Sequence, residues 1–362
     1  MKILTVVGAR PQFIKAAAVS RVLRQKHEEI LVHTGQHYDA NMSDIFFDEL
    51  KIPRPNFNLG IGSGTHGRQT GEMLIKIEEL LISERPDVVL IYGDTNSTLA
   101  GALAASKLII TVAHVEAGLR SYNRTMPEEQ NRVVTDHLAN WLFCPTDTAV
   151  SNLKKEGIIQ NVYNVGDVMC DALEFYKAIS QKKYNKTFGE GLLYIIKNDI
   201  SLKDIWYLAT IHRAENTDGE QNLSQILAAF EQFDAPVIFP VHPRTKGLIK
   251  QLDAQNGYQN IHFVEPVGYL YMLYLMSNAI KVVTDSGGLQ KEAYLLGIPC
   301  VTVREQTEWV ETLHGGWNVL ADAKTVDILQ KVLHVRADTA MRADYYGDGH
   351  AAQRISEIIK KP

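Results

Sequence analysis

The sequence has little cysteine and no long apolar run, and each shortage excludes a class of protein. Its three cysteines, Cys144, Cys170 and Cys300, are widely spaced and form no CxxC pair. We therefore expect neither a disulfide framework nor a metal site, and each cysteine should be a small buried side chain. Because no apolar stretch reaches the roughly 18 residues of a transmembrane helix, no membrane span is expected.

An excess of positive charge is also missing. The formal net charge is −5, so the chain lacks the broad positive surface that nucleic-acid binding needs. The residues before Gly8 hold one lysine and a short apolar run, which is too short for a signal-peptide core and is typical of a first strand. We therefore expect a cytoplasmic protein that binds no nucleic acid and no membrane.

The sequence does contain repeated short runs of β-branched and other apolar residues, separated by segments of helical length. Runs that are apolar on both faces are typical of parallel strands covered by helices. They occupy residues 3–7, 30–33, 88–92, 111–115, 206–211, 237–239, 280–284 and 300–303. With 362 residues, and roughly 150 per domain, we predict an α/β protein of two Rossmann-like, doubly wound domains that face a cleft.

A polar stretch without periodicity over residues 180–191 suits an exposed connection between the domains, and a hinge nearer residues 165–168 is an alternative. We place the N-terminal domain over residues 1–168 and the C-terminal domain over residues 169–348. The remaining residues, 349–362, have apolar side chains at helical spacing and should end the chain in a helix.

Polar residues follow most of the predicted strands. The strand ends carry GARPQ, HTGQH, YGDTNST, HVEAGLR, TIHRAEN, PVHPR, VEPVG and TDSGG. In open parallel sheets the carboxyl ends of the strands face the ligand crevice, so these residues are candidates for function.

The strongest of these motifs is TDSGG, in which a buried strand runs into glycines and then a helix. Gly287 and Gly288 let the backbone approach a ligand, and the helix start with Ser286 suits a diphosphate. Glu292, further along the helix, is a candidate for ribose hydroxyls. A plain strand-to-helix turn capped by Ser286 is the alternative, but the paired glycines favour a phosphate site.

Cations follow several strands. GARPQFIK carries Arg10 and Lys15 but is not GxGxxG, so a nicotinamide site is poorly supported. These two cations fit an anionic ligand and solvated helix-start charges equally well. Two histidine-arginine motifs, at His212-Arg213 and at His242, lie beside the predicted phosphate turn and favour anion recognition.

Carboxylates follow the third and fourth strands. Asp94 stands in GDTNST and Glu116 in HVEAGLR, and both should lie at the cleft. Helix capping is the alternative for Asp94 and is weaker for Glu116. Glu128 follows Pro127 in a first helical turn with Arg132 as an i, i+4 partner, so local helix chemistry alone explains it. These groups fit several reactions on a nucleoside diphosphate sugar.

The same motifs resemble a known family. GARPQFIK, GDTNSTLAG, HVEAGLRS, MPEEQNR, HRAEN, VHPR, TDSGGLQKEA and YGDG are, in this order, similar to motifs of the non-hydrolysing UDP-N-acetylglucosamine 2-epimerases, over essentially the whole chain. The resemblance implies a glycosyltransferase-B-like fold, a C-terminal helix that packs back on the first domain, a homodimer and no cofactor. It also implies a UDP-sugar substrate used for surface polysaccharide precursors.

In this family C2 is inverted by anti elimination of UDP, which gives a 2-acetamidoglucal, followed by re-addition. The resemblance implies acid and base roles for Asp94, Glu116 and Glu128, with His212 at the reacting centre. It therefore replaces the interpretation of Glu128 as an ordinary acid of a first helical turn. It implies that the diphosphate is held by Arg10, Lys15, Arg132, Arg213, His242, Ser286, Gly287 and Gly288. Glu292 would bind ribose, and residues 265–269, ending at Tyr269, would face uracil partly through the backbone.

Two departures bear on the substrate. HRAEN stands where many bacterial members have HRRE, and residues 307–311 read TEWVE in place of an ERPE-like stretch. This wording is similar to the branch that acts on UDP-2,3-diacetamido-2,3-dideoxyglucuronate. Three further activities fit the motifs less well: a hydrolysing epimerase that releases N-acetylmannosamine and UDP, a glycosyltransferase of the same fold, and a catalytically silent nucleotide-sugar-binding regulator.

Overall fold

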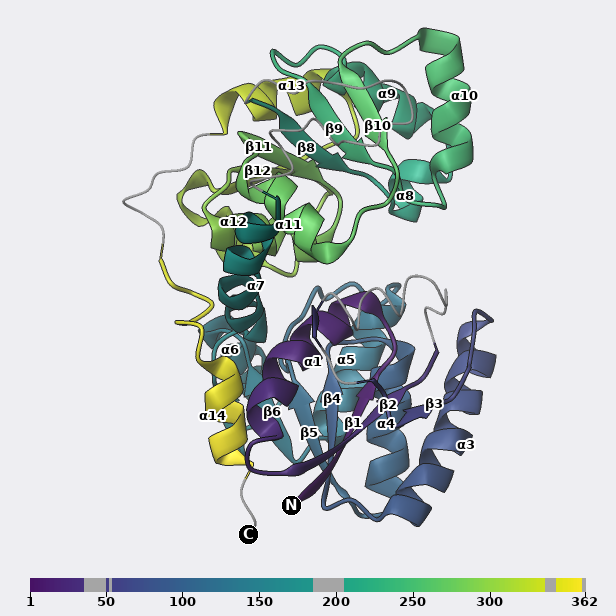
Figure 1. Cartoon of the computed structure of the whole chain (residues 1–362), viewed down its shortest axis with the longest axis vertical. Helices are drawn as coiled ribbons and strands as arrows, with labels where there is room; N and C mark the ends of the chain where they lie inside the picture. The colour runs from purple at the N-terminus through teal and green to yellow at the C-terminus, as the bar shows by residue number, and fades with distance from the viewer. Residues whose placement is uncertain (36–49, 52–53, 185–204, 336–342, 360–362) are drawn as a thin grey trace. The chain divides into compact units, whose positions relative to one another are not determined.

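The computed structural model describes the chain except for residues 36–49, 52–53, 185–204, 336–342 and 360–362, and it divides the chain into two compact units. Unit 1 consists of Met1–Glu174 and Asp344–Pro362, and unit 2 of Phe175–Ala343. Each unit contains one parallel sheet with helices packed against it (Figure 1). The predicted class, α/β with two parallel-sheet domains, is confirmed.

The sheet of unit 1 has seven strands in the order β3-β2-β1-β4-β5-β6-β7, and every adjacent pair is parallel. The chain moves outward from β1 to β3 and then returns to place β4 on the other side of β1. The strands are β1 (Lys2–Val7), β2 (Glu28–His33), β3 (Phe57–Asn58), β4 (Val88–Tyr92), β5 (Thr111–Val115), β6 (Trp141–Cys144) and β7 (Val162–Asn164).

The helices of unit 1 begin, in several cases, at residues suited to a helix start. Pro11 lies in the first turn of α1, and Pro127 opens α5, where a missing N–H is tolerated. The helices are α1 (Arg10–Leu23), α3 (His66–Glu84), α4 (Asn96–Lys107), α5 (Pro127–Leu138), α6 (Asp147–Lys155), α7 (Val168–Tyr184), which continues into unit 2, and α14 (Ala351–Ile358).

The sheet of unit 2 has six parallel strands in the order β10-β9-β8-β11-β12-β13, which repeats the plan of unit 1. The strands are β8 (Tyr207–Thr210), β9 (Val237–Pro240), β10 (Ile261–Val264), β11 (Lys281–Thr284), β12 (Cys300–Val303) and β13 (Asn318–Ala321). The helices are α8 (Ala214–Thr217), α9 (Glu220–Phe230), α10 (Lys246–Asn256), α11 (Tyr269–Ser277), α12 (Gly287–Leu296), the 3₁₀ helix η2 (Val310–Gly316) and α13 (Thr325–His334).

The central strands are buried on both faces, which explains their continuous apolar sequence. All five residues of β4 are fully buried, and burying such an aliphatic side chain contributes about 1.5–3 kcal/mol relative to leaving it exposed. The eight predicted strand runs are confirmed. The predicted connection at residues 180–191 is wrong at its start, because residues 180–184 continue α7, and its remainder lies outside the described residues.

Helix α14 belongs to unit 1 although it follows unit 2 in the sequence. It packs against α1, with Ala352 and Ile355 buried (Figure 1). The Asp171 carboxylate on α7 accepts hydrogen bonds from the backbone N–H groups of Ala351 and Ala352, at 3.1 and 2.9 Å. Because these N–H groups start a helix and have no partner within it, a carboxylate there stabilises the helix start.

The three cysteines are buried, as predicted. Burial raises the pKa of the Cys300 thiol to about 12 and also raises that of Cys144. In the part of the chain that the structure describes, no helix is long and apolar enough to cross a membrane.

Candidate functional site

The strand order identifies a crevice position in each unit. Strand order reverses between β1 and β4 in unit 1 and between β8 and β11 in unit 2. Ligands of doubly wound sheets bind outside the carboxyl ends of the strands at such a switch point. Most of the predicted site residues follow these four strands or the adjacent strand β5.

Asp94 follows β4 at the switch point of unit 1. Its side chain is 28% exposed, and its Oδ2 accepts a hydrogen bond of 2.5 Å from the Arg132 guanidinium. The N-cap of α4 is Thr95, whose hydroxyl accepts from the Thr98 N–H, so the alternative role of Asp94 as that cap is wrong. The Asp94 carboxylate therefore stays at the strand end, paired with a cation.

Glu116 follows β5 in a strained backbone conformation. Its φ is +73°, a region that residues with a side chain seldom occupy. The N–H groups of Glu116 and Ala117 both donate to the Phe143 carbonyl, at 3.0 and 3.1 Å, and hold this conformation. Strain of this kind clusters at functional sites, which agrees with the predicted role of Glu116.

Lys15 lies on α1 and forms a buried ion pair with Glu116. The ammonium is 2.6 Å from Glu116 Oε1, and the two side chains are 9% and 7% exposed. The sequence assigned Lys15 to a diphosphate, whereas the structure brings it to a candidate catalytic carboxylate. Arg10 begins α1, and its side chain lies outside the described part of the chain.

Helix α5 presents two neighbouring acids in opposite ways. Glu128 is exposed, whereas Glu129 is buried and accepts hydrogen bonds from the backbone N–H groups of Ser121 and Tyr122, at 2.9 and 2.8 Å. Arg132 donates to Glu129 at 2.8 Å as well as to Asp94. The predicted i, i+4 partner of Arg132 was Glu128, and the i, i+3 pair with Glu129 takes its place. Sequence spacing allowed either pair, and only burial distinguishes them.

Gln12 is a functional candidate that the sequence did not reveal. Its side-chain oxygen accepts from the N–H groups of Gly8 and Ala9, at 2.8 and 3.0 Å, and its NH₂ group donates to the Tyr92 carbonyl at 2.7 Å. Gln12 thus joins the turn after β1 to the turn after β4, directly across the switch point. Its position in GARPQ was visible, but its partners 80 residues away were not.

In unit 2, the buried Asp285 organises the turn that carries His212 and Arg213. Its carboxylate accepts from the N–H groups of His212, at 3.1 Å, and Arg213, at 2.9 Å, and from the Asn216 amide at 3.1 Å. Asp285 is fully buried at the end of β11 and precedes Ser286. This aspartate is the second residue of TDSGG, but the motif alone predicted no role for it.

The His212 ring is partly exposed beside this aspartate. It stacks on the His242 ring at an interplanar angle of 28°, with centroids 5.5 Å apart, and its Nδ1 is 3.5 Å from Asp285 Oδ1. Burial lowers the pKa of His212 although Asp285 acts in the opposite direction. A neutral imidazole can accept or donate a proton, as acid–base chemistry requires.

The predicted phosphate turn starts α12. Ser286 is the N-cap and accepts from the Leu289 N–H at 3.4 Å, so the capping alternative is confirmed, and the phosphate role of this turn stays a prediction. Gly287 is buried, and a Cβ there would lie 2.5 Å from Glu308 Oε1. Glu308 in turn is 3.0 Å from the guanidinium of the buried Arg304. A carboxylate and a cation therefore flank the positive end of a helix, where anions bind.

Gly288 is exposed, whereas two further predicted residues of unit 2, Glu292 and Tyr269, are buried. Glu292 lies on α12, and Tyr269, the first residue of α11, packs its ring edge-to-face against Tyr176. Since Tyr269 is only 3% exposed, its side chain offers little surface to a ligand. The buried Lys291 ammonium lies 3.8 Å from the centre of the Trp309 ring, a cation–π pair next to the phosphate turn.

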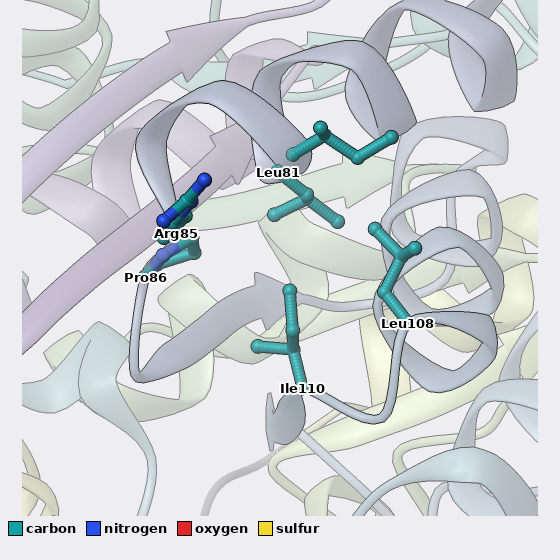
Figure 2. A pocket seen from close by; sticks show the side chains of 6 residues that line it. Leu81, Arg85, Pro86, Leu108 and Ile110 are labelled. Carbon is teal, nitrogen blue, oxygen red and sulfur yellow. The ribbon is translucent and has the colours of Figure 1, made fainter.

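A hollow of about 280 Å³ in unit 1 lies away from these residues. Its lining side chains come from the ends of α3 and α4 and from the segments that precede β4 and β5 (Figure 2). They are Leu81, Ile82, Arg85, Pro86, Leu108 and Ile110. The hollow therefore lies at the amino-terminal edge of the sheet, opposite the strand ends that carry Asp94 and Glu116.

Among the described residues, no group of three or more His, Cys, Asp or Glu could hold a metal ion.

Comparisons with known proteins agree over the whole chain. The sequence pattern of the family described as UDP-N-acetylglucosamine 2-epimerase matches residues 21–360. A Methanococcus maripaludis protein named UDP-N-acetylglucosamine 2-epimerase homolog is 53% identical over 363 residues, 99% of both chains. The UDP-2,3-diacetamido-2,3-dideoxy-D-glucuronate 2-epimerase of Pseudomonas aeruginosa is 47% identical over 371 residues, 100% of both chains.

One solved structure, Methanocaldococcus jannaschii UDP-GlcNAc 2-epimerase in complex with UDP-GlcNAc and UDP, is 42% identical to the chain. The match covers 99% of each chain, and the TM-score is 0.90. This likeness confirms the predicted glycosyltransferase-B-like class with two Rossmann-like domains.

Proposed function

Since the chain belongs to the UDP-N-acetylglucosamine 2-epimerase family, we propose that it inverts carbon 2 of a UDP-linked 2-acetamido sugar, with UDP-N-acetylglucosamine as substrate. One observation in the structure carries this proposal. Asp94 and Glu116 follow adjacent strands at the switch point of unit 1, and each is paired with a cation. Two carboxylates placed in this way provide the acid and base groups that the reaction needs.

The reaction needs such groups because the C2 hydrogen of the sugar has no adjacent carbonyl to acidify it. A base removes the C2 proton while UDP leaves C1 with the electron pair of the C1–O bond. The electrons of the C2–H bond form the C1=C2 double bond of a 2-acetamidoglucal. UDP then adds back to C1, and an acid returns a proton to the opposite face of C2. No net oxidation occurs.

We assign the acid and base roles to Asp94, Glu116 and Glu128, and the resemblance adds His212. Lys15 and Arg132, which the sequence assigned to the diphosphate, are paired with Glu116 and Asp94. We propose that the main role of each cation is to pair with its carboxylate, and that contact with the diphosphate is secondary.

We assign UDP binding mainly to unit 2. The start of α12 offers backbone N–H groups and the positive end of a helix dipole, which stabilise a diphosphate and, in the transition state, the leaving group. Glu292 is assigned to the ribose and the backbone near Tyr269 to uracil. The residues assigned to the diphosphate are Arg213, His242, Ser286, Gly287 and Gly288, together with Arg10 of unit 1.

UDP-2,3-diacetamido-2,3-dideoxyglucuronate is a second candidate substrate. A relative that is 47% identical over the whole chain carries this name, and Trp309 stands in the stretch that departs from the ERPE-like wording. The two substrates differ at carbons 3 and 6 of the sugar, so the reaction at C2 is the same for both.

The test is to incubate the protein in D₂O with each UDP-sugar and to follow the products by NMR. Deuterium at C2 of a sugar that is still linked to UDP, with both epimers present, is the expected result. Exchange with only the diacetamido-uronate would assign the chain to the second substrate. Free sugar without a UDP-linked epimer would indicate a hydrolysing enzyme, and no exchange with either sugar would refute the proposal.

We also propose that the protein is a homodimer and that it supplies precursors of surface polysaccharide, because the family resemblance implies both. Light scattering on a size-exclusion column tests the first point, since a monomer mass at micromolar concentration would contradict it. Loss of surface polysaccharide on deletion of the gene tests the second.

A further inference from the structure

Four ionisable side chains, three of them buried, are connected beneath the candidate site of unit 1. His114 Nδ1 on β5 lies 2.7 Å from Asp136 Oδ1 on α5, and the Arg120 guanidinium lies 2.7 Å from Asp136 Oδ2. Arg120 also makes a two-point pair with Glu156 at the end of α6, at 2.6 and 2.8 Å. The side chains of His114, Asp136 and Arg120 are at most 1% exposed. We call these four residues the charged chain.

The charged chain is bonded to the backbone beside both candidate carboxylates. His114 Nε2 lies 2.7 Å from the carbonyl of Gly93, the residue before Asp94. Asp136 Oδ2 accepts from the N–H of Gly118, two residues after Glu116, at 3.1 Å. Asp136 therefore ties α5, the helix that carries Glu128 and Arg132, to the ends of β4 and β5.

The geometry defines which His114 nitrogen donates to Gly93. A carbonyl oxygen only accepts hydrogen bonds, so Nε2 carries a proton to bond Gly93. Burial alone raises the pKa of Asp136, but the hydrogen bonds and charges of His114 and Arg120 outweigh it and lower that pKa. Asp136 is therefore a carboxylate, and it accepts hydrogen bonds from Arg120 and from the Gly118 N–H.

Stability alone gives no sufficient reason for such an arrangement. Replacing a buried ion pair with apolar residues of similar volume is often neutral or stabilising. Directional bonds, by contrast, fix backbone that would otherwise relax. One residue at this strand edge needs fixing, because Glu116 has a φ of +73°, which is unfavourable for a residue with a side chain, whereas the glycines Gly93 and Gly118 adopt positive φ readily. Strained backbone persists only where its surroundings determine it.

We propose that the charged chain positions Asp94 and Glu116 for their reaction by holding the backbone next to each of them. The inference rests on the proposed function, because it assumes that these carboxylates act on the C2 proton. His114 and Asp136 are positioning residues. They have no exposed surface from which to touch a sugar.

The experiment compares Asp136→Asn with Asp171→Asn, using C2 deuterium exchange, UDP titration and thermal unfolding of the whole chain. Asparagine keeps the size of Asp136 but turns one acceptor into an NH₂ donor that faces His114, Arg120 or Gly118. A misplacement of about 1 Å costs about 100-fold in rate, so kcat should fall by about that factor with little change in KM. The UDP affinity should stay within about two-fold, because we assign UDP binding to unit 2.

Asp171→Asn is the matched control, because Asp171 is also a largely buried carboxylate of unit 1 that accepts two backbone N–H bonds. It should lose stability while its kcat stays near that of the wild type. If Asp136→Asn keeps the wild-type kcat, or if both variants lose kcat in proportion to their loss of stability, the inference is wrong. If the wild type itself shows no exchange, the proposed function is wrong, and the inference, which depends on it, is wrong as well.

A second variant avoids any risk that Asp136→Asn does not fold. His114→Gln leaves Asp136 paired with Arg120 and removes the ring that bonds the Gly93 carbonyl. Its kcat should also fall, with little change in KM and in UDP affinity. A His114→Gln protein with the wild-type kcat would overturn the inference.

Discussion

The Lys15–Glu116 pair shows at the scale of single residues what a sequence can predict. The type of residue and its place after the first strand indicated a cation that faces an anion. The identity of that anion depends on a contact across 101 residues, which no local pattern contains. Asp285 illustrates the same limit, because its role depends on N–H groups that are contributed from a different strand end.

Substitution Lys15→Met should destabilise the protein by about 3–5 kcal/mol, because it removes one partner of a buried pair and leaves the Glu116 charge in place. The free energy of unfolding in urea measures this. The double variant Lys15→Met/Glu116→Gln should recover most of the loss. Arg68→Met, which removes an exposed helix pair with Glu72, is the control and should change the free energy of unfolding very little, because solvent screens this pair. Equal losses for the two methionine variants would contradict a special role for burial.

At the scale of elements, the positions of the polar strand ends were predicted well and the number of strands less well. Runs that are apolar on both faces identified the central strands. The strands β3, β6, β7 and β13 are two to four residues long and have weak sequence signals. They exist because a neighbouring strand offers a parallel edge. The polar strand ends were identified correctly as the turns after β1, β4, β5, β8 and β11. This prediction needs only the order of strands and polar residues along the chain, because the carboxyl ends of parallel strands face the ligand crevice.

The turn between β5 and α5 provides a test of tight packing. Gly118 and Gly157 have nearly equal φ values, +83° and +81°, but a Cβ on Gly118 would lie 2.4 Å from the Ala149 carbonyl oxygen, whereas the space beside Gly157 is open. Gly157→Ala should cost about 1–2 kcal/mol for the left-handed conformation alone.

Gly118→Ala should cost about 2–5 kcal/mol, because about 1–3 kcal/mol of overpacking adds to the same conformational cost. Thermal unfolding of both variants measures the difference. Because the backbone shift would also move Glu116, exchange at C2 should fall in Gly118→Ala and not in Gly157→Ala. A Gly118→Ala protein as stable as Gly157→Ala would show that the turn relaxes freely.

At the scale of the whole molecule, stability should depend on pH through partly buried histidines. Burial lowers the pKa of His27, His212 and His262, which lie in both units. Below about pH 6.5 the unfolded chain therefore binds more protons than the folded chain, so the stability present above that pH is lost as the pH falls.

We expect the unfolding temperature to drop between pH values of about 7 and 5.5, and the paired substitution His212→Asn/His262→Asn to make the drop shallower. Differential scanning calorimetry over this range measures both. A drop of the same size in the double variant would assign the pH dependence to other groups.

The packing of α14 on α1 makes unit 1 discontinuous in the sequence, whereas unit 2 is a single segment. On the ribosome, α1 leaves the exit tunnel early, but the surface that receives α14 stays uncovered until all of unit 2 has been synthesised. Domains usually complete in the order in which they are made. Here the order is reversed for the final step. All residues of unit 2, which is translated second, are available before the last helix of unit 1 has been synthesised.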